Sequence, residues 1–250
     1  MTREESILAK RLVDLSRQAD QKGIVTYSDF LNLNEQNIFH SLLSELYTGY
    51  EQSGGYEHAE RQMIAFLPDA LVFPVDYPMV CCRIAPVNRK FAEELSHRDV
   101  LGSLMSLGIE RGKLGDILVK DNLIYVFCHR TISRFLMEEL TRIRHTNVTI
   151  CLTELGETDI HPNMELCECI VTSNRLDGVL ASVYRVSRSL AAELIKKGCV
   201  FINGKETASG SYSCRPGEIV SVRGYGRFQF LDVSGETKKG RLKVQYNKYI

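Results

Sequence analysis

The chain of 250 residues contains no tryptophan and only six prolines, and it has no net charge, since 31 Lys and Arg balance 31 Asp and Glu. It has no apolar run near the roughly 20 residues that a membrane helix requires. The first residues, Met-Thr-Arg-Glu-Glu, are charged where a secretory signal is apolar. We therefore expect a cytoplasmic protein without a membrane span. An apolar share of 44% is typical of packed domains rather than of intrinsic disorder.

Cysteine is present, but not in the spacing of a metal site or a disulfide framework. The eight thiols occupy positions 81, 82, 128, 151, 167, 169, 199 and 214, with no C-x-x-C pair. Cys167 and Cys169 lack a second pair at zinc-finger distance. A chain of this length needs no cross-links to fold, and a reducing cytoplasm keeps thiols free. We expect free thiols, no metal and no cofactor.

The zero net charge conceals a strong segregation along the chain. Residues 173–250 hold 14 basic and 6 acidic side chains, a net of +8, whereas residues 1–172 hold 17 and 25, a net of −8. Such asymmetry indicates an end that binds a polyanion. The alternative is an ordinary solvated surface, and the placement of the charges decides between the two.

Residues 1–70 are predicted to form a helical N-terminal domain. Apolar residues recur at helical spacing over 7–15, and again on one side of a segment that begins at 34 or 35 and ends at 46. Ser53-Gly54-Gly55 predicts a turn after the second helix. This segment contains no catalytic combination of residues.

Residues 71–165 are predicted to form a central α/β domain. The patterns indicate, in order, a strand at 79–84, a helix at 99–107, strands at 117–119 and 123–128 around a turn at 120–122, a helix at 132–143 and a strand at 148–152. This order is the split βαβ pattern of ferredoxin-like and RRM-like domains. Many nucleic-acid binders use this fold, although fold alone assigns no function. Four arginines either extend a phosphate-contacting surface or form a solvated helix face: Arg130, Arg134, Arg142 and Arg144.

Two motifs in this domain imitate enzymes. His97-Arg98-Asp99 matches the start of a kinase catalytic loop, but Leu104 stands where the metal-binding Asn belongs and D-F-G is absent from the sequence. The glycine-rich residues 111–116 match neither a P-loop nor a dinucleotide fingerprint. We therefore reject both a kinase and a nucleotide-binding enzyme.

Residues 173–250 are predicted to form two short helices followed by a strongly turned sheet. Leu176, Val179, Leu180 and Val183 make one apolar stripe, after a cap at Ser173 or Asn174. Ser187 caps a second helix, which carries Lys196 and Lys197 in its last turn and ends at Gly198. A strand begins at Val200, Asn203-Gly204 forms a hairpin, and the final strand turns Leu242, Val244 and Tyr246 inward.

Eight cations of this module are not needed for its core and are our candidate RNA-binding residues: Arg175, Arg185, Arg188, Lys196, Lys197, Lys205, Arg223 and Arg227. Guanidinium groups suit phosphate because their donors form a planar fork. Arg175 and Arg188 rank first because they stand at helix starts, where the dipole also favours an anion. Few aromatics are available for base stacking, so we expect structured RNA rather than a single strand. The alternative for each cation is a solvated charge.

The last segment resembles the "S-four" RNA-binding domain, or alpha-L motif, named after a small-subunit ribosomal protein. The resemblance covers roughly residues 173–230, with Glu218 where Asp is commoner, and rests on these motifs: Arg175-Leu176-Asp177, Ser187-Arg188, Ile195-x-x-Gly198-x-Val200, Asn203-Gly204-Lys205, Pro216-Gly217-Glu218 and Val222-Arg223-Gly224. Carrying the domain's role over position by position implies RNA contacts at seven of the candidates, all but Arg185. Asp177 is expected to be structural, as a partner for an arginine.

The whole chain is similar to the YlmH family of bacteria and plastids. The supporting positions are Gly54-Gly55-Tyr56, Glu60-Arg61, His97-Arg98-Asp99, Leu101-Gly102, Leu107-Gly108-Ile109, Gly115-Asp116-Ile117 and Gly226-Arg227. The resemblance implies a non-catalytic, monomeric factor of ribosome-associated quality control. Such a factor binds large ribosomal subunits that still hold peptidyl-tRNA, contacts ribosomal RNA and tRNA, and supports alanine tailing together with other quality-control factors.

Two alternatives belong to other classes. A pseudouridine synthase also has a catalytic Arg-Leu-Asp, but Arg175-Leu176-Asp177 lies inside the RNA-binding motif and no long catalytic domain follows it. A scaffold for cell-division proteins, suggested by the family's gene neighbourhood, requires a large apolar surface patch that no segment indicates.

Overall fold

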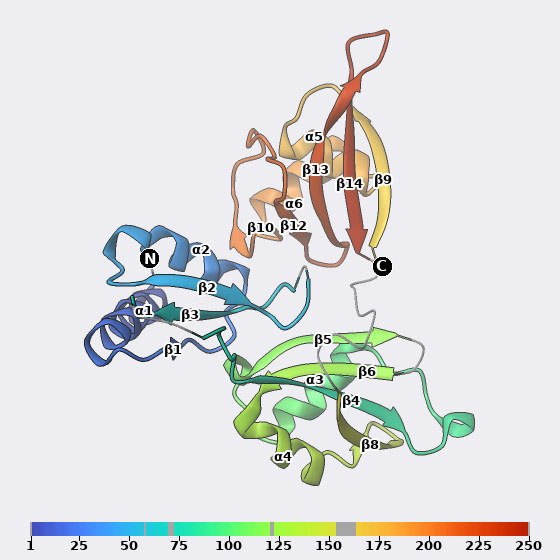
Figure 1. Ribbon diagram of the computed structural model, residues 1–250. Coiled ribbons are helices and arrows are strands. Elements are labelled where there is room, and N and C mark those ends of the chain that lie inside the picture. Colours follow the sequence, from blue (N-terminus) through green and yellow to red (C-terminus); the bar gives the residue numbers. More distant parts are fainter. Residues whose placement is uncertain (1, 58, 70–72, 121–122, 154–163, 250) are drawn as a thin grey trace. The chain divides into compact units, whose positions relative to one another are not determined.

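The computed structural model describes residues 2–57, 59–69, 73–120, 123–153 and 164–249 (Figure 1). The chain divides into two compact units, residues 1–161 and 162–250. The predicted α+β class is confirmed. The division into three domains, at 1–70, 71–165 and 173–250, stays a prediction. In the described part of the chain, no helix combines the length and apolar character needed to cross a membrane.

The N-terminal segment contains the two predicted helices and also a sheet that was not predicted. Helix α1 (Arg3–Lys22) begins with a capping box and is followed by α2 (Leu33–Ser41) and the 3-10 turn η1 (Leu43–Glu45). Strands β1 (Thr26–Tyr27), β3 (Met63–Leu67) and β2 (Gly49–Ser53) form an antiparallel sheet in that order. The predicted end of the second helix at residue 46 is wrong, because the chain turns at Leu42.

The central segment has the predicted split βαβ order. Its strands are β4 (Met79–Pro86), β5 (Leu114–Lys120), β6 (Leu123–His129), β7 (Arg142–Ile143) and β8 (Thr146–Thr153), arranged β5-β6-β4-β8-β7 with every pair antiparallel. The helical elements are α3 (His97–Ser106), α4 (Arg130–Glu139) and the short turns η2 (Arg89–Phe91) and η3 (Arg111–Lys113). Helix α4 ends four residues before the predicted position, since Ile143 already belongs to β7. Of the predicted turn at 120–122, residues 121 and 122 lie outside the described residues.

A buried polar network joins the N-terminal segment to the central sheet. The Arg61 side chain, only 7% exposed, donates from Nη2 to the carbonyl of Phe30 at 2.7 Å and from Nε to that of Leu114 at 2.9 Å. The Asp116 carboxylate accepts from the Tyr56 hydroxyl at 2.6 Å and from the Arg61 N–H at 3.1 Å. The Glu60-Arg61 and Gly115-Asp116 motifs of the sequence therefore hold this unit together.

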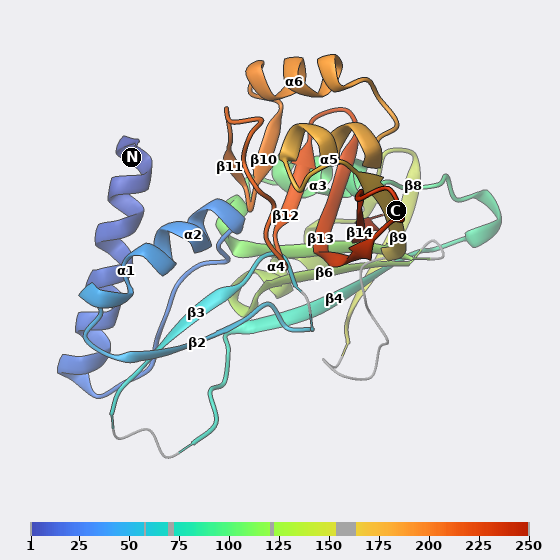
Figure 2. The same cartoon turned by 90° about the horizontal axis from the view of Figure 1, so that it is seen from above.

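The C-terminal unit is a six-stranded antiparallel sheet with two helices on one face (Figures 1 and 2). Its elements are β9 (Met164–Val171), α5 (Leu176–Val183), α6 (Arg188–Lys196), β10 (Val200–Ile202), β11 (Lys205–Glu206), β12 (Ile219–Val222), β13 (Gly226–Glu236) and β14 (Leu242–Tyr249). The strand order is β11-β10-β12-β13-β14-β9, so β9, which precedes residue 173, completes this sheet.

The predicted core of this unit is confirmed. The four apolar residues of the stripe on α5 are at most 7% exposed, as are Ala191 and Ile195 on α6. On β14, Val244 and Tyr246 are buried and Leu242 packs against the same cluster. None of the eight cysteines, all of which are described, forms a disulfide. Because the core consists of these apolar side chains, the candidate cations are left for the surface.

Candidate nucleic-acid interface

Arg175 and Asp177 form a fixed pair at the start of α5. Arg175 is the residue before the helix, and its Nε and Nη2 donate to the two Asp177 carboxylate oxygens at 3.2 and 3.1 Å. The Gly178 N–H donates to Asp177 Oδ1 at 2.8 Å. The hydrogen bonds from Arg175 hold the pKa of Asp177 below its usual value. The prediction that Asp177 is the partner of an arginine is confirmed.

Arg188, at the start of α6, extends its side chain to the start of α5. The Ser187 hydroxyl caps this helix by accepting the Leu190 N–H at 3.1 Å. Arg188 Nη2 donates to the Thr172 hydroxyl at 3.3 Å. A Cβ atom on Gly178 would lie 2.9 Å from that nitrogen, so glycine leaves the space that the guanidinium occupies. The charge of Arg188 also lowers the pKa of Asp177, after the larger effect of the hydrogen bonds from Arg175, so two helix starts bring the two first-ranked arginines near one carboxylate.

Sequence reasoning missed the roles of Thr172 and Gly178 in this arrangement. A glycine in the first turn of an otherwise apolar helix is a signal of close approach, because glycine costs helix stability without such a reason. Thr172 carries no comparable signal, since it meets Arg188 across 16 residues of sequence.

A second group of cations surrounds β10. Lys196 and Lys197 end α6, and Lys197 Nζ pairs with Glu193 Oε1 at 2.6 Å. Lys205 on β11 and Arg223 after β12 flank β10 on opposite sides, since both strands pair with it. The Arg223 N–H donates to the Cys199 carbonyl at 2.9 Å. All four side chains are exposed.

The remaining two cations lie beside tyrosines. Arg227 stacks on the ring of Tyr249 at 4.3 Å from the centroid. Arg185 has a φ of 53° after the end of α5. Burial raises the pKa of Tyr246 to about 12, and the charge of Arg185 opposes that rise. Arg185 and Arg227 thus belong to an aromatic part of the unit.

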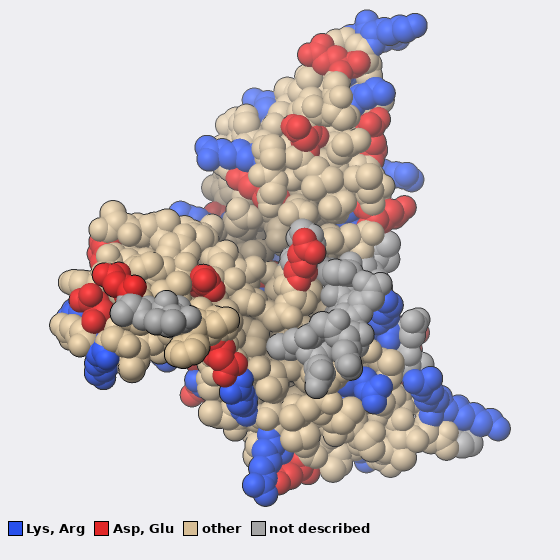
Figure 3. All heavy atoms as spheres, viewed as in Figure 1, with Lys and Arg blue, Asp and Glu red and all other residues tan. Residues whose placement is uncertain are grey.

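The structure therefore distributes the eight candidates over three groups. The first group is Arg175 and Arg188 at the helix starts, the second is Lys196, Lys197, Lys205 and Arg223 around β10, and the third is Arg185 and Arg227 beside tyrosines. The connection from Tyr184 to Arg188 links the first group to the third, and the turn from Arg223 to Arg227 links the second to the third. Figure 3 shows cations and anions mixed on the sheet side of this unit, while α5 and α6 lie on the other side in Figure 1. The binding of RNA by these residues stays a prediction.

The four arginines of the central segment show a different pattern. Arg130 pairs with Asp76 at 3.0 Å, and Arg134 pairs with Glu138 at 2.8 Å. Arg144 lies 3.7 Å from the carboxylates of both Glu93 and Asp99. Three of the four arginines are therefore engaged in ion pairs at the surface.

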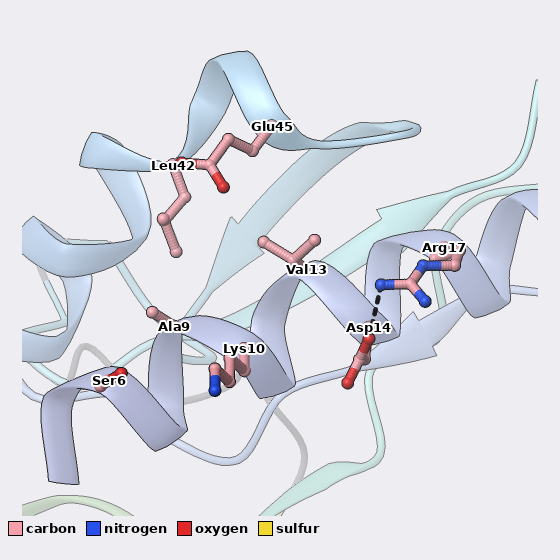
Figure 4. Close-up of a pocket in the computed structure, with 8 residues that line it drawn as sticks. All are labelled: Ser6, Ala9, Lys10, Val13, Asp14, Arg17, Leu42 and Glu45. Atoms are coloured by element: carbon pink, nitrogen blue, oxygen red, sulfur yellow. Dashed lines mark hydrogen bonds and ion pairs between the residues drawn. The ribbon is translucent and has the colours of Figure 1, made fainter. Parts of the chain in front are cut away.

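A pocket of about 350 Å³ lies beside α1 in the other unit (Figure 4). It is lined by Ser6, Ala9, Lys10, Val13, Asp14, Arg17, Leu42 and Glu45. Arg17 Nη2 donates to Asp14 Oδ1 at 2.8 Å within the pocket. The lining contains none of the eight candidates, and within the described ranges no cluster of three His, Cys, Asp or Glu side chains could hold a metal ion.

Comparison with known proteins matches two segments of the chain to families. Residues 74–157 match the family of the RNA-binding domain in YlmH, and residues 174–220 match the S4 domain family. The second match ends before β13, so the long β13–β14 hairpin lies beyond it.

Among individual proteins, the chain is 28% identical over 250 residues to ribosome-associated protein quality control protein P2 of Bacillus subtilis, covering 98% of this chain and 96% of that protein. Small ribosomal subunit protein uS4 of Akkermansia muciniphila is 40% identical over 72 residues, which are 25% of this chain and 34% of that protein. The solved structure "Cell division protein ylmH from Streptococcus pneumoniae" resembles 63% of this chain and 96% of its own length, at 20% identity and a TM-score of 0.53, which shows a similar fold.

Proposed function

We propose that this YlmH-like RNA-binding protein, which contains an S4 domain at residues 174–220, acts on the large ribosomal subunit in the cytoplasm. There it binds ribosomal RNA and tRNA on stalled complexes that hold peptidyl-tRNA, and it supports alanine tailing of the stalled chain. It does so as a monomer, without a cofactor and without catalysing a reaction.

The observation that carries this proposal is that Arg175 and Arg188, which stand at two helix starts, both lie near the carboxylate of Asp177. Both guanidinium groups are on the surface, and the carboxylate of Asp177 fixes the orientation of Arg175 with two hydrogen bonds. An oriented guanidinium fork loses little freedom when it binds the two oxygens of a phosphate. The net charge of +8 over residues 173–250 then adds the long-range attraction that phosphate backbones require.

The choice of ribosomal RNA is supported by two relatives. The Bacillus subtilis protein, aligned over nearly its whole length, is named for ribosome-associated quality control, and the S4 segment is shared with a small ribosomal subunit protein. Both names refer to the ribosome, which is rich in folded RNA.

A non-catalytic role is supported by the state of Asp177. In a pseudouridine synthase the corresponding carboxylate would have to reach a uridine, whereas here both oxygens accept hydrogen bonds from Arg175 and one also accepts the Gly178 N–H. Uridine isomerisation is measured on ribosomal RNA with the wild-type chain and with Asp177→Asn as the control. We expect no turnover with either, and isomerisation that is lost in Asp177→Asn would identify an enzyme.

Co-sedimentation with purified ribosomal subunits tests the ribosomal part of the proposal. The full chain is mixed separately with large subunits, with small subunits, and with large subunits that hold peptidyl-tRNA. We expect the strongest co-sedimentation with the peptidyl-tRNA complex and the weakest with small subunits. Equal binding to large and small subunits would contradict the assignment.

A further inference from the structure

The turn between β12 and β13 presents a tyrosine at its tip. Gly224 and Gly226, with φ angles of 84° and 103°, flank Tyr225, and glycine is the residue that adopts such angles without strain. Tyr225 is 39% exposed, and tyrosine combines an apolar ring with a polar hydroxyl, which suits it to a binding surface. The backbone thus directs one ring out of the unit.

The Tyr225 ring packs against another aromatic side chain of the same unit. The ring of Tyr184, at the end of α5, lies 5.6 Å from Tyr225 at an angle of 58°, and 6.0 Å from buried Phe228. The Tyr184 hydroxyl donates to the Gly226 carbonyl at 3.0 Å, which ties the end of the helix to the turn. Burial raises the pKa of Tyr184, so its hydroxyl remains a donor across the physiological range. Tyr225 therefore stands on a rigid support.

Arginines flank this tyrosine in the sequence. Arg223 and Arg227 are two residues away on either side, and each guanidinium lies over another aromatic ring, that of Phe201 at 4.9 Å and that of Tyr249 at 4.3 Å. Arg185 follows Tyr184 directly. An exposed ring on a turn that carries arginines on both sides suits unpaired nucleotides, because a base can stack on the ring while the cations bind the backbone.

We propose that Tyr225 is a stacking site for one unpaired nucleobase of the bound RNA. Arg223 and Arg185 contact the phosphates on either side of that nucleotide. The site rests on the proposed function, and it narrows the RNA from any folded helix to one that carries a bulged or looped-out base next to the helical part. The helix starts at Arg175 and Arg188 bind the folded part, while the turn at Tyr225 recognises the interruption.

Two RNA hairpins that differ by a single nucleotide test this site. One carries a bulged 2-aminopurine, and the other has the same 2-aminopurine paired with uridine. The full wild-type chain is expected to bind the bulged hairpin more tightly and to quench its fluorescence, since stacking quenches 2-aminopurine. Tyr225→Ala should lower affinity for the bulged hairpin about tenfold, as removal of one base–aromatic contact does, and should abolish the quenching. Tyr225→Phe should keep both properties, because the ring face is retained.

A control and a second variant separate stacking from misfolding. Tyr47→Ala removes a 53% exposed tyrosine with an arginine, Arg17, nearby, but in the other unit, and it should change nothing. Tyr225→Leu keeps an apolar side chain at the tip and should behave like Tyr225→Ala. Thermal unfolding of each variant by circular dichroism should match the wild type.

Three results would overturn the inference in different ways. Unchanged affinity and quenching in Tyr225→Ala would remove the stacking site and leave the proposed function standing. An equal loss on both hairpins would show that the turn contacts duplex RNA instead of a base. If the wild-type chain binds neither hairpin, nor large ribosomal subunits, the proposed function itself fails.

Discussion

Replacing Arg188 by alanine should weaken RNA binding without unfolding the protein. The side chain is exposed, and its hydrogen bond to Thr172, at 3.3 Å, joins two surface groups. Surface substitutions of this kind change stability by no more than about 0.5 kcal/mol. The variant should therefore unfold at the same urea concentration as the wild type, so that any effect on RNA belongs to binding.

The expected loss of binding follows from a single phosphate contact. If all eight candidate cations contact duplex phosphates, the logarithm of the association constant should fall with the logarithm of salt concentration with a slope of roughly −7. Removing Arg188 should reduce this slope to about −6 and cost about 1–3 kcal/mol of binding free energy. Arg188→Lys should keep the slope and lose part of the affinity, because an ammonium group lacks the planar fork.

The assay is a titration of large-subunit RNA with fluorescently labelled protein at several KCl concentrations between 50 and 300 mM. Arg17→Ala is the matched control, since it removes the same charge from an ion-paired arginine on α1 in the other unit. Its salt dependence should equal that of the wild type. If Arg188→Ala and Arg17→Ala gave the same affinity and slope, binding would depend on net charge alone, and the assignment of Arg188 would be refuted.

Two further predictions concern the unit of residues 1–161. Arg61→Met should lower the free energy of unfolding in urea by about 1–3 kcal/mol, because the Phe30 carbonyl loses its donor while the Leu114 carbonyl keeps the hydrogen bond from Arg111 Nη1 at 2.7 Å. The exposed Arg83→Met should leave the free energy of unfolding unchanged, and equal midpoints for the two variants would contradict the role of the network. Desolvation, followed by the charge of Arg111, lowers the pKa of His97 in the folded state, while Asp116 opposes the shift. The unfolded chain therefore takes up the proton first, so His97 contributes stability above pH about 6.5 that is lost as the pH falls through the folded-state pKa. His97→Gln should flatten this part of the pH profile of thermal unfolding, and an unchanged profile would count against the shift.

The sequence was sufficient to predict the fold wherever apolar periodicity was regular. The stripe on α5 and the alternation on β14 predicted which residues are buried, and the strand and helix order of the central segment was correct. The N-terminal sheet escaped prediction because β3 is a short, wholly apolar run without alternation, and β2 is largely polar. Neither strand shows the period of two that identifies a half-buried strand.

Residue types identified the candidate cations, but their grouping required tertiary structure. Arg188 meets Thr172 and Gly178 only after two helices have packed, and Tyr184 reaches Gly226 across 42 residues. The contacts of the residue at position 218 also depend on tertiary structure. Glu218 is buried at 8% exposure and accepts the Arg215 N–H at 2.8 Å together with the Tyr212 hydroxyl. This hydrogen bond holds the partly buried side chain of Tyr212 next to Glu218.

The central claim is that the cations of residues 173–250 bind folded ribosomal RNA. Cells that express the tagged full chain are irradiated with ultraviolet light, the large-subunit fraction is isolated on a sucrose gradient, and both the RNA and the peptides joined to it are identified. We expect large-subunit ribosomal RNA joined to peptides that span Arg175 to Arg227. Crosslinks confined to residues 1–161, or a protein that stays at the top of the gradient, would contradict the account.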